Sequence, residues 1–236
     1  MNPNPRWVFG VCQAASLALI AASLHFWGAA EIRADVFEVL FLTIAGLIWL
    51  MLASALFPWF GLSLRDDAME RNNRGALVAL CGGLFAVAFI YMGGSVGEGP
   101  SYFNNLFCVV LGTASLFLLW MTLEFAGKIS RSIAEERDQA TGMRLCGFLL
   151  AAGLVLGRAL AGNWHSEADT FRDFLHDGWP AVAICVLAML IERFARPSRQ
   201  RPFPAWTRYG MIPGLVYLAL AGAWLWHLGP WEGMSK

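Results

Sequence analysis

The sequence predicts an all-α fold, a polytopic membrane helix bundle of about seven transmembrane helices built from repeated two-helix hairpins. Of the 236 residues, 58% are hydrophobic and 14% are charged, which is too apolar for a soluble domain. Seven apolar runs are each about 20 residues long, enough to cross a hydrocarbon core of roughly 30 Å. A polar segment that precedes one apolar run also returns before another. We therefore treat 1–236 as a single integral membrane domain.

The first and sixth runs need separate justification. The first follows MNPNPR, which carries one arginine, and no clear cleavage site follows it, so we expect a retained helix and not a signal peptide. The sixth is short and has Pro180 near its start, where proline is tolerated in a first helical turn. The seven expected spans are roughly 7–28, 37–60, 75–96, 102–125, 143–163, 174–194 and 209–229.

Basic residues predict the orientation, because lysine and arginine collect on the cytoplasmic side of a membrane protein. Arg33, Arg158, Arg172 and Lys236 fall on one side. The other thirteen of the seventeen fall on the side of the N-terminus, which predicts a cytoplasmic N-terminus and an external C-terminus. These thirteen are Arg6, Arg65, Arg71, Arg74, Lys128, Arg131, Arg137, Arg144, Arg193, Arg196, Arg199, Arg201 and Arg208.

The five cysteines all fall inside expected spans, so no disulfide framework is predicted. Cys12, Cys81 and Cys146 share a similar depth, which would suit metal or redox chemistry. Buried cysteine more often serves as a small hydrophobic residue, and we adopt that interpretation.

Two stretches of the chain are alike, MERNNRGALVALCGG at 69–83 and AEERDQATGMRLCGF at 134–148. The preceding spans also correspond, since DVFEVLF matches SYFNNLF and, more loosely, DTFRDFL. A fixed period of this kind indicates one supersecondary unit packed against copies of itself. The units are hairpin repeat one at 37–96, hairpin repeat two at 102–163 and a degenerate hairpin repeat three at 174–229. The first span resembles an unpaired second half.

Over residues 37 to 163 these repeats resemble the YjfL-like inner-membrane proteins, a family of uncharacterised function with tandem two-helix repeats. In that family a loop ending in an acidic residue and asparagine leads into an Ala- and Gly-rich helix. Asp138 departs from the pattern, and the third copy has lost both the acid and the amide. The resemblance implies a fold and a location in the bacterial inner membrane, and no reaction. The matching residues are Glu70, Asn72, Asn73, Ala76 and Gly82, then Glu136, Ala140, Gly142, Met143 and Gly147.

The repeated polar motif allows a structural and a functional interpretation. Asn72 and Asp138 stand where a side chain can cap a helix N-terminus, and small residues after them allow close helix packing. Alternatively, the two motifs form a cytoplasmic mouth for an ion, a headgroup or a partner. The ligand or partner candidates are Glu70, Arg71, Asn72, Glu136, Arg137 and Asp138.

Charged residues within the spans lie near predicted ends, where long side chains can reach water. Because no helix centre carries a charge, we do not expect a proton relay or a deep charged transport site. The charged residues concerned are Glu38, Glu124, Arg144, Arg158 and Glu192.

Histidines suggest an alternative at the outer face, where we expect His25, His165, His176 and His227. His165 and His176 lie among the carboxylates of Glu167, Asp169, Asp173 and Asp177, a set that could hold a divalent metal, and His25 with His227 could ligate haem. No HxxH, HExxH or CxxCH spacing is present, so we expect no cofactor.

The leading hypothesis is a multi-pass, non-enzymatic structural or interaction component of the membrane. The alternatives are a small-solute or ion channel or transporter, and a metal- or haem-binding redox or sensor protein at the outer face. The chain has no GxSxG motif and no phosphate-binding glycine loop. Zero formal net charge gives no reason to expect nucleic acid. The expected partners are the lipid bilayer, another membrane protein or a second copy of the chain.

Overall fold

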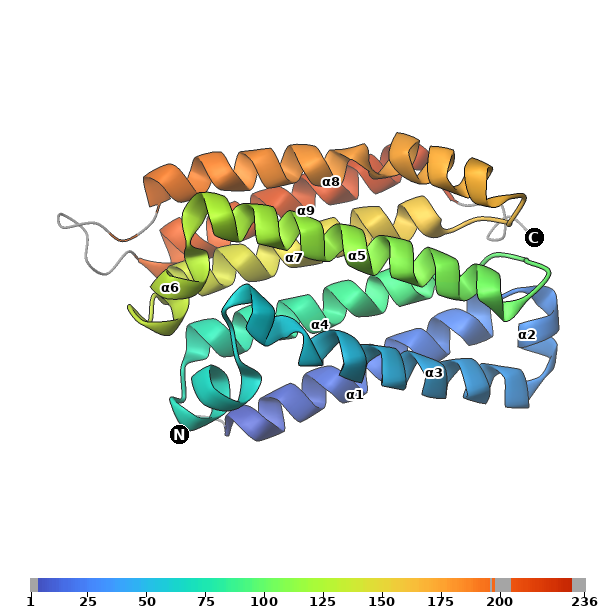
Figure 1. Ribbon diagram of the computed structural model, residues 1–236, viewed down its shortest axis with the longest axis horizontal. Coiled ribbons are helices and arrows are strands. Elements are labelled where there is room, and N and C mark those ends of the chain that lie inside the picture. Colours follow the sequence, from blue (N-terminus) through green and yellow to red (C-terminus); the bar gives the residue numbers. More distant parts are fainter. Residues whose placement is uncertain (1–3, 196, 198–204, 231–236) are drawn as a thin grey trace.

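The computed structural model describes residues 4–195, 197 and 205–230, and it is an all-α helical bundle (Figure 1). Seven helices are long and apolar enough to cross a membrane, as predicted. Arg196, Arg199, Arg201 and Lys236, which the charge count included, lie outside the described residues.

Each long helix falls close to an expected span. Their bounds are α1 Pro5–Trp27, α3 Val36–Ala55 with the 3₁₀ turn η1 Phe57–Phe60, α4 Arg74–Ser95, α5 Tyr102–Gly127, α7 Gln139–Leu160, α8 Glu167–Ala195, and the π-helical turn η3 Thr207–Met211 leading into α9 Ile212–Leu228. Three short elements lie in the connections: α2 Ala30–Ala34, the π-helical turn η2 Leu64–Glu70 and α6 Ile129–Ala134.

The sixth span was predicted too short. Helix α8 begins at Glu167, because Ser166 and Asp169 cap its first turn by exchanging hydrogen bonds, with Asp169 N donating to Ser166 Oγ at 3.1 Å. The helix therefore starts in polar sequence ahead of the apolar run. As a result, Pro180 lies inside the helix and not in its first turn.

The predicted capping residue is correct in the second motif and wrong by one position in the first. Asp138 accepts hydrogen bonds from the backbone N–H groups of Ala140 and Thr141 at 3.1 and 3.0 Å, as expected of a cap. In the first motif Asn73, not Asn72, caps α4 by accepting from Ala76 N at 3.2 Å. Asn72 instead takes a left-handed conformation with φ of 50°, which closes the preceding turn.

The long helices form two layers (Figure 1). Helices α1, α4, α7 and α9 lie side by side in that order and all run in the same direction. Helices α3, α5 and α8 run in the opposite direction and cover one face of this row. We call the end of the bundle where α1 begins the N end, and the end where α9 finishes the C end.

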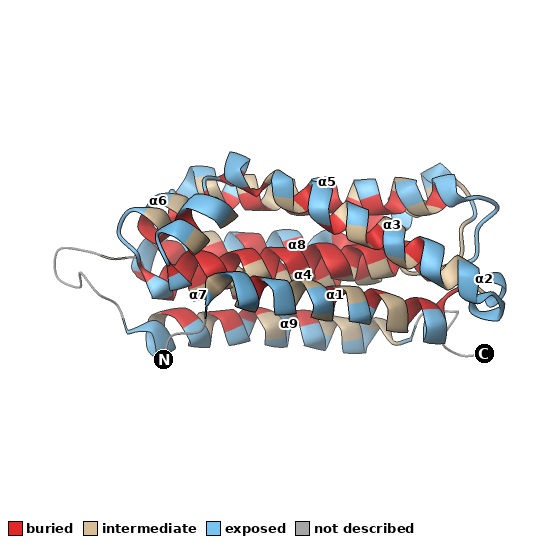
Figure 2. Cartoon of the chain, turned by 90° about the horizontal axis from the view of Figure 1, so that it is seen from below, coloured by how far each residue is buried: buried red, intermediate tan, exposed pale blue. Residues whose placement is uncertain are grey.

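Helices α4 and α7 form the centre of the row. Of the most apolar 18 residues in each, 72% are buried, against 28% in α1 and 17% in α9, and Figure 2 shows burial concentrated along the middle of the bundle. Small residues allow this contact. A Cβ on Gly82 would lie 2.7 Å from Cys146 Sγ, and one on Gly93 would collide with the backbone carbonyl of Gly157.

On the other face of the row, between α1 and α9, α4 and α7 carry a stripe of half-buried side chains at helical spacing, and we call this stripe the trough and its residues the floor. The flanking helices α1 and α9 lie away from the α3 and α5 layer (Figure 2). The floor residues are Cys81, Phe85, Phe89 and Met92 on α4, and Met143, Cys146, Leu150 and Leu154 on α7.

Candidate functional site

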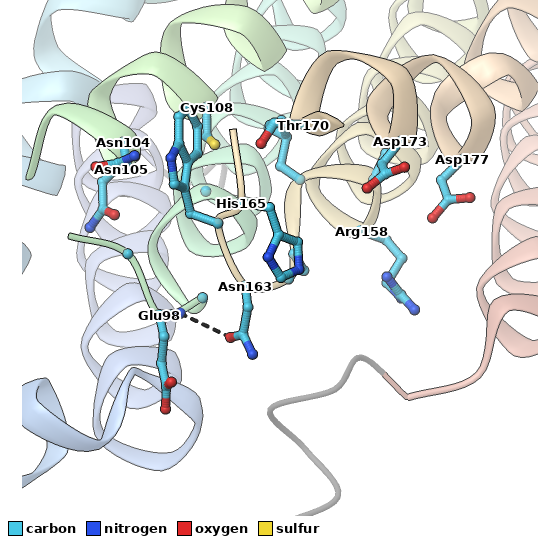
Figure 3. Close-up of a pocket in the computed structure, with 18 of the residues that line it drawn as sticks. Glu98, Asn104, Asn105, Cys108, Arg158, Asn163, His165, Thr170, Asp173 and Asp177 are labelled. Atoms are coloured by element: carbon cyan, nitrogen blue, oxygen red, sulfur yellow. Dashed lines mark hydrogen bonds between the residues drawn. The ribbon is translucent and has the colours of Figure 1, made fainter. Parts of the chain in front are cut away.

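A polar cavity of about 250 Å³ opens at the C end of the bundle (Figure 3). Two loops and the ends of four helices enclose it, together with Pro230 after α9. The loops follow α4 and α7, and the helices are α4, α5, α7 and α8. Its polar lining consists of Glu98, Asn104, Asn105, Arg158, Asn163, His165, Thr170, Asp173 and Asp177.

Hydrogen bonds between the two loops fix the wall of this cavity. Glu98 N donates to the Asn163 side-chain oxygen at 3.1 Å (Figure 3), and Trp164 N donates to the Glu98 carbonyl at 2.8 Å. The glycines of these loops also approach closely, since a Cβ on Gly97 would collide with the carbonyl of Gly162. A wall held by backbone contacts keeps its shape in the absence of any ligand.

Arg158 is the positive group of the cavity. It belongs to the last turn of α7, and its Nη2 donates to the Gly229 carbonyl at 3.1 Å. Its Nε is buried and has no hydrogen-bond partner among the described residues. A buried guanidinium N–H without a partner is costly, and a small movement of the side chain toward an acceptor in the cavity would relieve that cost.

Three carboxylates face the same cavity. Asp177 is half-buried and interacts electrostatically with Arg158, whereas Asp173 and Glu98 are exposed. Figure 3 shows Asp173 and Asp177 on neighbouring turns of α8, close to Arg158. The site therefore offers one cation with a carboxylate beside it and further carboxylates nearby, an arrangement that suits a ligand carrying both charges.

The six motif residues lie at the other end of the molecule, the N end. Glu70 forms an exposed ion pair with Arg65 at 3.1 Å, and Arg71 pairs with Asp67 at 3.2 Å. Arg137 donates to the backbone carbonyl of Arg71, so the two motifs are in contact. Arg137 has a φ of 55°, like that of Asn72.

These motif side chains are largely used in holding the fold. Asp138 is buried and acts as a cap, and Asn73 also donates to the Ile133 carbonyl at 2.6 Å. Glu136 and Arg137 are exposed, and Arg71, Glu135 and Arg137 line only an open depression. The motif residues thus mainly stabilise the fold. The N end gathers fewer free polar groups than the C-end cavity does.

Arg144 and Glu192 were expected to reach water, and that expectation was wrong. Arg144 Nε lies 2.5 Å from one Glu192 oxygen and Nη2 lies 2.8 Å from the other, with both side chains buried. Arg144 also bonds Thr141 Oγ1 at 2.7 Å and the Tyr209 carbonyl. Helix α8 packs over the end of α7, so the two charges neutralise each other inside the bundle.

The four histidines are distributed over separate elements. His25 contacts Phe26 on α1, His227 lies against Trp224 on α9, and His176 lies 2.8 Å from Asp177 on α8. Only His165 lines the cavity. Across the described residues, no three His, Cys, Asp or Glu side chains gather as a metal site would require.

Sequence analysis did not select Arg158, Asn104 or Asn105 as site residues. A signal for them was present, because polar residues inside apolar spans are costly and often functional. Arg158 stands in an apolar helix, and the paired amides occur in the first turn of α5.

Fold and cavity together define a multi-pass membrane protein with a polar pocket at one end of its bundle. Comparison of the chain with protein-family models, with curated proteins and with solved structures found no match.

Proposed function

We propose that this protein is a non-enzymatic interaction component of the bacterial inner membrane, which binds a small zwitterionic group in the C-end cavity. The observation that carries the proposal is the buried, unpartnered Nε of Arg158 in a cavity that also contains Asp173 and Asp177. An anionic group on the ligand would accept from Arg158, and a cationic group would lie among the carboxylates.

The size of the cavity supports a small ligand. About 250 Å³ holds roughly eight water molecules at ~30 Å³ each, which leaves room for a compact zwitterion such as O-phosphoethanolamine. The proposal places the cavity outside the cell, with a cytoplasmic N-terminus, because thirteen of the seventeen basic residues belong to the opposite side.

We also infer that the chain is built from repeated hairpins of the YjfL-like kind. In support, the turns before α4 and α7 share a left-handed residue, at Asn72 and Arg137, followed by a capping residue, at Asn73 and Asp138.

Thermal unfolding of the detergent-purified protein tests the binding role. With O-phosphoethanolamine at about 10 mM and an affinity on the order of 1 mM, we expect the melting temperature to rise by roughly 3 to 6 °C. Gly162→Phe should abolish the rise, since Gly162 lines the cavity and a Cβ there meets no atom within 4 Å.

Gly222→Phe is the matched control. Gly222 lies on α9 outside the cavity and has equally open space around its Cβ. This variant should respond to O-phosphoethanolamine as the wild type does. An unchanged melting temperature of the wild type, or an equal rise in Gly162→Phe, would contradict the proposed function.

A further inference from the structure

The trough on α4 and α7 reaches residues that also line the polar cavity. Close to the C end it deepens into an apolar crevice of about 130 Å³, walled by Ser23 and Trp27 of α1 and Leu225 of α9. Arg158 and Ala161 line both the crevice and the cavity. The two spaces therefore share a border at the end of α7.

The chemistry changes in a fixed order along this path. Leu154 lies in the apolar crevice, and Arg158 lies one turn, about 6 Å, closer to the C end. Helix α8 runs in the reverse direction, so Asp173 lies one turn further out than Asp177. Gly178, next to Asp177, packs against Leu156 and Ala159, so Asp177 is level with Arg158. A molecule along the path meets hydrocarbon, then Arg158 with Asp177 beside it, then Asp173.

We propose that the occupant is a phospholipid of the outer leaflet with a zwitterionic, primary-amine headgroup. One acyl chain would lie in the trough, the phosphate would accept from Arg158, and the ammonium would donate to Asp173 and Asp177. This order of tail, phosphate and amine matches the order of the lining residues. The inference rests on the proposed function, because the headgroup is the zwitterion that the cavity binds.

The position of the trough favours a lipid as its source. Its floor belongs to two helices that are long and apolar enough to span a membrane, so its uncovered side would face hydrocarbon in a bilayer and a lipid would enter laterally. A guanidinium is a donor suited to phosphate, and Arg158 lines both the apolar crevice and the polar cavity.

Native mass spectrometry of the full chain tests this with three probes: dioleoyl phosphatidylethanolamine, dioleoyl phosphatidylglycerol and O-phosphoethanolamine. We expect one phosphatidylethanolamine to be retained per chain, with an affinity at least about tenfold above that of either other probe, because only this lipid satisfies both the trough and the carboxylates. Arg158→Gln should lower retention of phosphatidylethanolamine about tenfold. Leu154→Asn should also lower its retention, because it places a polar group against the acyl chain.

Two substitutions provide matched controls. Arg172→Gln removes an exposed arginine of α8 outside the cavity, and Leu190→Asn changes an exposed leucine of α8 outside the trough. Both should retain the lipid as the wild type does, and melting temperatures of all four variants verify folding.

Other results would overturn the inference in identifiable ways. If O-phosphoethanolamine binds as tightly as the lipid, or Leu154→Asn has no effect, the cavity takes a free solute and the proposed function survives without the lipid. Equal retention of phosphatidylglycerol would exclude recognition of the amine. A dimer that Leu154→Asn dissociates would mean that a second copy of the chain occupies the trough.

Discussion

At the scale of the residue, the buried ion pair of Arg144 and Glu192 shows how charge can stay inside an apolar bundle. Each side chain is almost fully buried, and the guanidinium meets the carboxylate through two hydrogen bonds of 2.5 and 2.8 Å. Removing one partner leaves the other charge without compensation in a medium that solvates it poorly. Removing one partner is therefore expected to cost more stability than the attraction between the two charges contributes.

We predict that Arg144→Met lowers the free energy of unfolding by about 3 to 5 kcal/mol, because Glu192 is left buried and unpaired. The double variant Arg144→Met with Glu192→Leu should recover most of that loss, since neither charge remains. Equilibrium unfolding in detergent micelles measures both.

The exposed pair of Arg131 and Glu135, joined at 3.0 Å, supplies the comparison. Arg131→Met should cost less than about 1 kcal/mol, because water already screens this pair. A double variant at 144 and 192 that is no more stable than the single one would show that the pair does not act as a unit.

Some roles of single residues could be predicted from the sequence and others could not. Asp138 was correctly predicted as a cap, whereas Asn73 takes the part expected of Asn72. Two adjacent asparagines are equivalent by residue type, and only the backbone path decides which one faces the helix. Arg144 lies near a span end in the sequence, yet the packing of α8 removes it from water, and no local pattern reveals that contact.

At the scale of the element, the contact between α4 and α7 depends on residues without a side chain. Gly75 packs near the Asp138 carbonyl, Gly82 against Cys146 and Gly93 against Gly157. Membrane helices gain little from the hydrophobic effect, so close approach and dispersion must hold them together.

Gly93→Ala should therefore destabilise the protein by about 1 to 3 kcal/mol, because its Cβ would collide with the Gly157 carbonyl. Gly222→Ala, on a helix position with open space, should leave the protein unchanged or stabilise it by less than about 1 kcal/mol. Thermal unfolding of the two variants side by side distinguishes packing from helix propensity. Equal melting temperatures would argue against close packing at Gly93.

Elements were the most predictable part of the fold. Seven spans follow from apolar length alone, because a lipid environment demands continuous helices. The early start of α8 was missed because its first turns are polar, and hydropathy cannot detect a helix that extends beyond the hydrocarbon. The cavity was missed for a related reason, since its lining comes from four helices and two loops that only tertiary packing brings together.

At the scale of the whole molecule, the odd number of spans among the described residues places the start of α1 and the end of α9 at opposite ends of the bundle (Figure 1). We predict that alkaline phosphatase fused after Lys236 is active and that green fluorescent protein fused there stays dark, because the excess of basic residues on the N-end side predicts a cytoplasmic N end. Fluorescence from the second fusion would contradict the predicted orientation, and with it the side on which we expect the cavity to open.

The parallel arrangement of α4 and α7 also has a consequence for biosynthesis. Helix α5 separates them in the chain, so α4 leaves the ribosome and enters the bilayer before its main partner has been translated. At ~5–20 residues per second, that interval lasts several seconds. During it the glycine-rich side of α4 faces lipid, or whatever insertion factor shields it. The nascent chain is therefore most vulnerable to quality-control proteases between the completion of its third span and the arrival of its fifth.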